Sequence, residues 1–316
     1  MEKDPIILLL LLLICSSCYS QYADPCENFT VLDNIESRHP TTTGNSLTID
    51  DRNLSTGWYA APRKWKLLSR DPGKGSMCGN SSPFYRKTQF GPSSLMCLRT
   101  FDGACTYADM IRTRMCGGRE IYRLKTMSVR TAYCFVSKLD ILIVEDVSRS
   151  IGKPNFDEMK RFQESMVNST IIGRDAVNVA LIAFSSNARV VFRFTEYSNN
   201  KSGVLAALQQ QTYEEGPSTN IGDAIKLATS TIINGDRNDA DSKVIMFTDG
   251  CTTMEDREAI AASIGSLKAK AEVFVVAISE VDANSTIHLI ASGPSNVIQI
   301  GSPDAASAVV QKMMAP

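Results

Sequence analysis

Five oxygen-bearing side chains stand at three places in the second half of the chain. They are the carboxylates Asp146 and Asp249 and the hydroxyls Ser148, Ser150 and Thr219. Hard oxygen donors of this kind suit Mg²⁺, and Mn²⁺ or Ca²⁺ less exclusively, whereas softer metals prefer thiolate or imidazole ligands. Because three of the five are neutral, a cation held by them keeps an open position for an external carboxylate. We therefore predict a divalent-cation site; the alternative is that the hydroxyls cap helices and turns.

Apolar segments around these residues predict the elements that must position them. Four runs have the length and β-branching of strands buried on both faces, at 140–144, 177–184, 244–247 and 273–278. Helical patterns occupy 156–162, 222–233, 255–270 and 305–314, and 189–194 forms a predicted hairpin with the strand before it. This alternation predicts an α/β domain with a doubly wound, mainly parallel, Rossmann-like sheet. Ligands collect at the carboxyl ends of such strands, where Asp146 and Asp249 lie.

Three short motifs carry a resemblance to a known family. Asp146-x-Ser148-x-Ser150, Thr219 followed by Gly222, and Phe247-Thr248-Asp249-Gly250 occur in that order on the predicted strand framework. Residues 138–314 resemble a von Willebrand factor type A domain with a metal-ion-dependent adhesion site.

The resemblance implies a role for each motif residue. It implies that Ser148, Ser150 and Thr219 coordinate the metal through oxygen, and that Asp146 and Asp249 bind it directly or through water. It also implies that the last helix, 304–314, can shift when ligand binds. Arg149 stands where the family usually has a small residue. The positive charge of Arg149 either weakens metal binding or points outward and assists binding of an acidic partner.

The first half of the chain is built differently, because most of the nine cysteines are concentrated there. Six of them fall within residues 24–134, namely Cys26, Cys78, Cys97, Cys105, Cys116 and Cys134. In an oxidising compartment this even set predicts three disulfides in a small loop- and strand-rich domain, with fifteen pairings open. A zinc site is the alternative, but the segment has no CxxC pair and His39 is its only imidazole.

Residues 24–134 also contain phrases that resemble a second family. Asp24-Pro25-Cys26, Gly57-Trp58-Tyr59, Cys116-Gly117-Gly118 and Ala132-Tyr133-Cys134 are similar to parts of the uromodulin-type eight-cysteine domain. The chain departs from that family in having six cysteines, so we expect at least one family disulfide to be absent. The resemblance implies an extracellular glycoprotein. We place a linker at 135–138 and the type A domain at 139–316.

The extreme N-terminus predicts secretion. Nine consecutive Ile or Leu residues at 6–14 are followed by small and polar residues. This pattern is typical of a signal peptide, here 1–20, and the run is too short to span a bilayer. No other segment is apolar enough to cross a membrane. Secretion makes six N-x-S/T sequons candidate glycan sites, at Asn28, Asn53, Asn80, Asn168, Asn200 and Asn284.

Charge and the remaining residues narrow the function. With 33 Lys+Arg against 34 Asp+Glu, the chain lacks the basic surplus of a nucleic-acid-binding protein. The donors around the metal include no general base suited to neutral pH, so we do not expect an enzyme. Cys251 makes the mature cysteine count odd, and it is either a buried free thiol or the link of a disulfide-bonded dimer.

We predict a secreted adhesion or matrix-associated glycoprotein that binds an acidic residue of an extracellular protein through the cation. The alternative is a glycan-bearing structural or defence glycoprotein whose type A domain serves assembly only. Deglycosylation distinguishes the two, because it removes only the second activity.

Overall fold

A computed structural model describes most of the chain. The described residues are 24–40, 49–62, 64–69, 71, 78–80, 82–99, 105–238, 240–278, 286–300 and 305–314. The predicted signal peptide and the sequon at Asn284 lie outside them. The chain divides into two compact units, and each is described by itself. The N-terminal unit is drawn from Met1–Arg38, Gly44–Arg63 and Leu67–Cys134, and the second unit from His39–Thr43, Lys64–Lys66 and Phe135–Pro316.

The second unit is built on a six-stranded sheet whose order is β12-β11-β10-β13-β14-β15. The strands are β10 (Leu139–Asp146), β11 (Val177–Phe184), β12 (Ala188–Phe192), β13 (Asp241–Thr248), β14 (Glu272–Ala277) and β15 (Val297–Gln299). Every pairing is parallel except that of β11 with β12, which is antiparallel. All eight residues of β10 are buried, as expected of a central strand covered on both faces. The predicted mainly parallel sheet and the predicted hairpin are confirmed.

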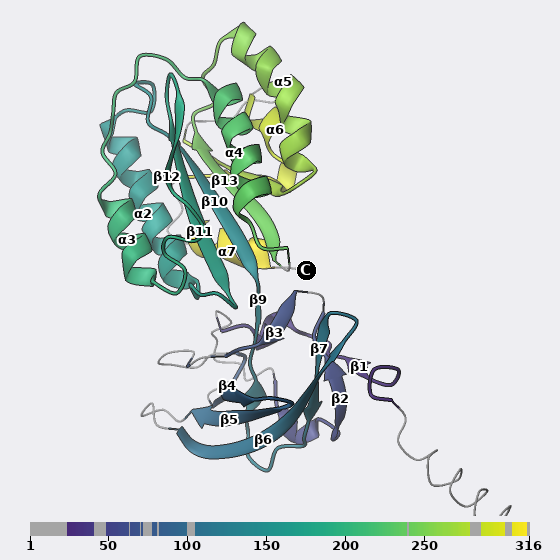
Figure 1. Cartoon of the computed structure of the whole chain (residues 1–316). Helices are drawn as coiled ribbons and strands as arrows, with labels where there is room; N and C mark the ends of the chain where they lie inside the picture. The colour runs from purple at the N-terminus through teal and green to yellow at the C-terminus, as the bar shows by residue number, and fades with distance from the viewer. Residues whose placement is uncertain are drawn as a thin grey trace, which may run out of the picture. The chain divides into compact units, whose positions relative to one another are not determined.

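Helices cover both faces of this sheet (Figure 1). On one face α2 (Lys153–Ser169), α3 (Lys201–Gln209) and α7 (Ala305–Met314) pack against Ile141 and Ile143 of β10. On the other, α4 (Ile221–Gly235), α5 (Met254–Lys268) and α6 (Thr286–Ile290) pack against Leu142 and Val144. Alternate residues of one strand thus enter two separate cores, because successive side chains of a strand point to opposite faces. A 3-10 turn, η3 (Pro294–Asn296), precedes β15.

The strands and helices predicted for the second unit are present in the structure, which adds three elements that were not predicted, α3, α6 and β15. Helix α3 was not predicted because Gly203 interrupts its short apolar pattern. The structure gives Gly203 a packing role, since a Cβ there would lie 2.6 Å from Cδ1 of Tyr197 and 2.5 Å from Nδ2 of Asn200. Asn200 caps this helix, with its side chain accepting a hydrogen bond from the Gly203 N–H.

The N-terminal unit contains a seven-stranded sheet of order β1-β2-β7-β6-β5-β4-β8. The strands are β1 (Thr30–Val31), β2 (Gly57–Ala60), β4 (Pro83–Phe90), β5 (Ser93–Arg99), β6 (Cys105–Cys116), β7 (Arg119–Leu124) and β8 (Ala132–Tyr133). The five inner strands, β2-β7-β6-β5-β4 in sheet order, pair antiparallel with one another. The short outer strands β1 and β8 pair parallel with β2 and β4. The short turns η1 (Glu36–Arg38) and η2 (Asp51–Asn53) also lie here. Separately, β3 (Trp65–Leu67) pairs with β9 (Phe135–Ser137).

Three disulfides bond all six cysteines of this region: Cys26–Cys116, Cys78–Cys134 and Cys97–Cys105. The predicted number of disulfides is confirmed, and the zinc alternative is wrong because each sulfur is bonded to another sulfur. Two of the bridges join residues 90 and 56 positions apart. In the chain-entropy account, bridges across long segments restrict the unfolded chain most.

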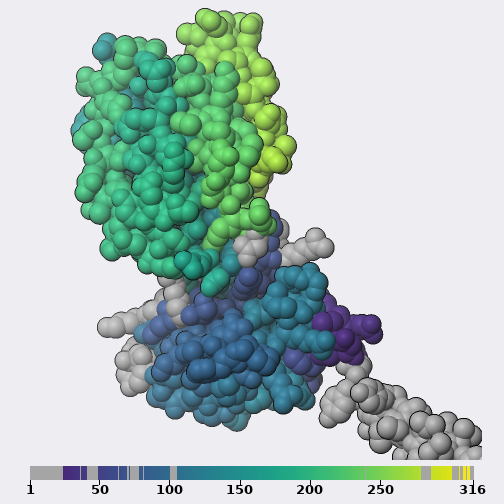
Figure 2. Space-filling view, in the orientation of Figure 1, coloured from purple at the N-terminus to yellow at the C-terminus, as the bar shows by residue number. Residues whose placement is uncertain are grey.

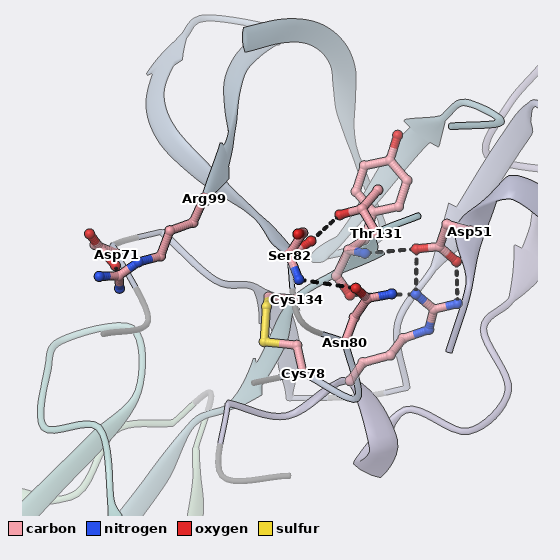
Figure 3. Close-up of a disulfide and its surroundings, with 10 residues drawn as sticks. Asp51, Asp71, Cys78, Asn80, Ser82, Arg99, Thr131 and Cys134 are labelled. Carbon is pink, nitrogen blue, oxygen red and sulfur yellow. Dashed lines mark hydrogen bonds and ion pairs between the residues drawn. A yellow bond between two sulfur atoms is a disulfide. The ribbon is translucent and has the colours of Figure 1, made fainter. Parts of the chain in front are cut away.

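A buried polar network surrounds the Cys78–Cys134 bridge (Figure 3). The Arg38 guanidinium donates to both carboxylate oxygens of Asp51 at 2.8 Å, and the Tyr133 backbone N–H donates to the same carboxylate at 2.7 Å. Asn80 is 1% exposed, and its side-chain amide donates to the Ile49 carbonyl at 2.8 Å. The structure therefore disagrees with the predicted glycan at Asn80, because the nitrogen that would carry the sugar is buried and bonded.

The other described sequons are accessible: Asn28, Asn53, Asn168 and Asn200 have exposed side chains, so glycosylation there stays a prediction. Across the ranges that the structure describes, no helix is long and apolar enough to cross a bilayer.

Candidate metal centre

Two neighbouring strands bring the two candidate acidic ligands to one edge of the sheet. β10 ends at Asp146, and β13 ends one residue before Asp249. The strands pair in parallel, with Glu145 opposite Phe247, so their carboxyl ends lie side by side. The predicted position of the site at the carboxyl edge follows from this register.

A third loop, before α4, lies against the segment that follows β10. Ser148 forms a parallel bridge with Gly216, and the Arg149 N–H donates to the Gly216 carbonyl at 2.9 Å. The Tyr213 hydroxyl donates to the carbonyl oxygens of Ser148 and Arg149, at 3.2 and 3.0 Å. These bonds hold the loop that carries Thr219 beside the serine motif. Thr219 and Asp249 are both half-buried.

Asp146 is the fixed point of the arrangement. Its carboxylate is fully buried; one oxygen accepts the Ser148 N–H at 3.0 Å and the other accepts the Thr248 hydroxyl at 2.8 Å. Burial raises the pKa of Asp146 to about 6, and the nearby Asp249 carboxylate raises it as well. A positive charge at this position would oppose both effects by favouring the ionised form. The sequence motif predicted no role for Thr248, but in the structure its hydroxyl donates to Asp146 and orients that carboxylate.

The serine hydroxyls have the spacing expected of two ligands of one small cation. Ser148 Oγ and Ser150 Oγ form a hydrogen bond with each other and lie 3.2 Å apart. Two oxygens that bind Mg²⁺ at right angles, each about 2.1 Å from the ion, are about 3 Å apart. Ser148 is buried while Ser150 is exposed, so the pair lies at the boundary between protein and solvent. The residues present therefore fit a hard divalent cation.

The centre has few negative charges. Among the described residues, no group of three or more His, Cys, Asp or Glu side chains is placed to hold a metal ion. Asp146 and Asp249 would supply the anionic ligands, and hydroxyl oxygens would have to complete the set.

One supporting residue was missed by the sequence analysis. Asp256, in the first turn of α5, is 9% exposed and accepts the backbone N–H groups of Ile221 and Gly222 at 2.9 Å. It also accepts the Thr252 hydroxyl. One carboxylate thus joins the start of α4, two residues after Thr219, to the loop that contains Asp249.

The sequence contained only a partial signal for Asp256. Thr253-x-x-Asp256 is typical of a helix start, and Thr253 does cap α5. That pattern shows nothing of the bonds to α4. Gly222 belongs to the same contact, because a Cβ there would lie 2.9 Å from Asp256 Oδ1 and 2.9 Å from Ala259 Cβ.

Two side chains at the rim are exposed. Arg149 is exposed and has no ion-pair partner within the described part of the chain, and its effect on the metal or on an acidic partner stays a prediction. Cys251 is a free and exposed thiol, so the interpretation of a buried thiol is wrong. Partial burial and the Asp249 carboxylate raise the pKa of the Cys251 thiol.

Comparison with known proteins assigns the family. The sequence model of the von Willebrand factor type A domain matches residues 140–312, more than half of the chain, and the chain belongs to this family. The match does not extend to the N-terminal unit.

The relatives match part of this chain. The mouse protein Collagen alpha-4(VI) chain is 32% identical over 141 residues, which are 42% of this chain and 6% of that protein. Chicken Matrilin-1 is 32% identical over 117 residues, which are 36% of this chain and 23% of that protein. The chain thus spans less than a quarter of the length of these relatives.

Among solved structures, proximal thread matrix protein 1 from the mussel byssus has a TM-score of 0.49 and 24% identity, covering 57% of this chain and 46% of that chain.

Proposed function

We propose that the second unit binds an extracellular protein through a divalent cation, Mg²⁺ first and Mn²⁺ or Ca²⁺ as alternatives. The ligands we assign are Asp146, Ser148, Ser150, Thr219 and Asp249. The observation that carries the proposal is the buried Asp146 carboxylate, held by Ser148 and Thr248 beside two hydroxyls 3.2 Å apart.

The chemistry of the proposed site follows from its donors. A cation held there supplies an open position for a carboxylate of the partner. Asp146 and Asp249 supply negative charge, and the neutral hydroxyls leave the cation electrophilic. The exposed Arg149 adds attraction for an acidic partner at the rim.

The setting we propose is extracellular. Three disulfides favour an oxidising compartment, and relatives named as a collagen VI chain and a matrilin favour a matrix or adhesion role. We accordingly propose a secreted, non-enzymatic glycoprotein with a cleaved signal peptide and a uromodulin-type N-terminal module. The exposed thiol of Cys251 is available for a disulfide-linked dimer.

Calorimetry with Mg²⁺ tests the metal site directly. We expect the purified chain to release or absorb heat on Mg²⁺ addition, and Asp249→Ala to lose this signal. Asp157→Ala is the matched control, because it removes one partly exposed carboxylate, paired with Lys153, from the surface of the same unit. Equal binding heats from wild type and Asp249→Ala would refute the assignment of the ligands.

Partner binding tests the proposed function itself. Material retained from extracellular matrix by the immobilised chain should be released by EDTA and should not bind Asp249→Ala. Full retention under both conditions would show that the cation is not the bridge.

The exposed sequons favour one alternative, a glycan-bearing structural or defence glycoprotein. Its activity would be removed by deglycosylation and would survive EDTA.

A further inference from the structure

The nearly neutral chain hides two oppositely charged segments. Residues 24–134 contain 16 Lys+Arg and 10 Asp+Glu, a net charge of +6, whereas residues 135–316 contain 16 and 22, a net charge of −6. Lys64 and Lys66 belong to the second unit, so residues 24–134 of the N-terminal unit hold 14 Lys+Arg and 10 Asp+Glu, a net charge of +4. This surplus creates a positive potential around the N-terminal unit. Several arginines of this unit are neutralised by acidic partners, for example in Arg86–Glu120, Arg99–Asp71 and Arg114–Asp24.

Two arginines at the centre of the seven-stranded sheet are not neutralised. Arg112 of β6 lies directly opposite Arg123 of β7 in the strand register, and both are exposed. Neither has an ion-pair or hydrogen-bond partner among the residues that the structure describes. Like charges directly opposite one another destabilise a strand pair. An anion bound between the two guanidinium groups would offset this repulsion.

The surroundings of the pair form an open site. A concavity of about 530 Å³ is lined by residues of four segments, namely Thr56, Ser93, Met110, Ile111, Arg112, Arg123, Lys125 and Thr126. Lys125 is already paired with Asp109 at 2.9 Å, so the two arginines carry the uncompensated charge. Trp58, half-buried on β2, is the other in-register neighbour of Arg123. Residues of the strands β4 to β6, in blue, lie on the face of this unit turned toward the viewer in Figure 2.

We propose that this concavity, with Arg112 and Arg123 at its centre, binds the sulfate groups of a sulfated polysaccharide. A guanidinium presents a planar fork of N–H donors that grips an oxyanion through two hydrogen bonds. Two adjacent forks suit a polymer with repeated oxyanions better than a single free ion, because the concavity is open. The Ser93 hydroxyl matches sugar hydroxyls, whereas those of Thr56 and Thr126 already hydrogen-bond within the protein. Met110 in the concavity and Trp58 beside Arg123 offer apolar surface to sugar rings.

An acidic peptide fits this site less well. β6 and β7 are both inner strands with a neighbour on each side, so no free strand edge is available for a peptide backbone to pair with. A ligand at this site is therefore bound by side chains alone, which suits a polymer that is recognised through its oxyanions. The proposed site lies within the N-terminal unit and uses no metal, so it is independent of the cation site.

A heparin-derived octasaccharide is the probe, with its binding to the full chain measured by calorimetry at several salt concentrations. We expect binding that weakens with salt, survives EDTA, and falls at least tenfold in Arg112→Ala/Arg123→Ala. The matched control is Arg52→Ala/Arg130→Ala, which removes two half-exposed arginines of the same unit that both lie near Asp50. An equal loss in the control would overturn the proposal, because it would show general charge attraction.

Two further arms test the chemistry. Arg112→Lys/Arg123→Lys keeps the charge and removes the forks, and we expect an intermediate affinity; wild-type affinity would overturn the assignment of the forks. Polyglutamate of equal charge should bind more weakly than the octasaccharide, and equal binding would overturn the polysaccharide assignment. Unchanged thermal midpoints in all variants would show that each effect arises from the site.

Discussion

Replacing Asp256 should loosen the candidate metal centre without touching any predicted ligand. Its carboxylate accepts the Ile221 and Gly222 N–H groups at 2.9 Å as well as the Thr252 hydroxyl. In Asp256→Ala two backbone donors at the start of α4 lose their partner. Each buried donor left unsatisfied costs about 1–3 kcal/mol, so we expect a loss of roughly 3 kcal/mol in the free energy of unfolding. For a domain of this size that corresponds to a decrease of about 10 °C in melting temperature.

The same change should weaken Mg²⁺ binding, because Asp256 joins the segments that carry Thr219 and Asp249. A loss of about 1.4 kcal/mol in binding corresponds to a tenfold lower affinity, and we expect at least that. Glu255→Ala is the control, since it removes an exposed carboxylate from the same turn of α5. It should cost only the interaction with the helix dipole, about 0.3–1 kcal/mol.

Thermal unfolding and Mg²⁺ titration of the two variants measure both effects. The melting temperature and Mg²⁺ affinity of Asp256→Asn should lie between those of Asp256→Ala and Glu255→Ala, because one acceptor oxygen remains. If Asp256→Ala and Glu255→Ala had the same melting temperature and the same Mg²⁺ affinity, the coupling of these loops through Asp256 would be wrong.

Three further predictions follow from single positions. In a denaturant titration, Gly216→Ala should lower the free energy of unfolding by about 2 kcal/mol or more, since its Cβ would lie 2.3 Å from Ser185 Cβ. The control is Gly265→Ala in α5, whose Cβ would meet nothing within 4 Å, and it should be neutral or stabilising. Glycopeptide mass spectrometry of secreted protein should find Asn80 unmodified while exposed sequons carry glycans, and a glycan at Asn80 would contradict the buried position. Burial lowers the pKa of His39 to about 3, whereas its pKa in the unfolded chain is about 6.5. The stability that the neutral His39 gives the folded chain is therefore complete above pH 6.5 and decreases as the pH falls towards 3. Relative to His39→Gln, the wild type should therefore lose about 2 kcal/mol in the free energy of unfolding between pH 7.5 and 5. If the difference in stability between the two proteins did not change with pH, the lowered pKa of His39 would be wrong.

The sequence allowed much of the second unit to be predicted. Continuous β-branched runs indicate strands buried on both faces, and parallel strands end at one edge, so the positions of Asp146 and Asp249 followed from two runs in the chain. Helix α3 was missed because its glycine is required by packing against Tyr197, which local propensity does not reveal.

The supporting contacts could not be predicted, because they join segments far apart in the chain. The bond from Thr248 to Asp146 spans 102 positions, and those from α4 to Asp256 span 34 and 35. Each depends on how two loops meet after the sheet has formed. The pairing of Cys26 with Cys116 and the burial of Asn80 have the same origin, since neither follows from local pattern.

The opposed arginines show why net charge alone is a poor guide to partners. A total of −1 excludes a broad basic surface when the charges are spread evenly, yet here the two halves differ by twelve charges, from +6 to −6. The strand register then places two of the positive charges opposite each other without a counter-ion in the described structure. Attraction through these arginines should weaken with salt and ignore chelators, whereas attraction through the candidate cation should vanish with chelator and depend less on salt. The two proposed sites can therefore be separated in the intact chain by changing the solution alone, before any residue is replaced.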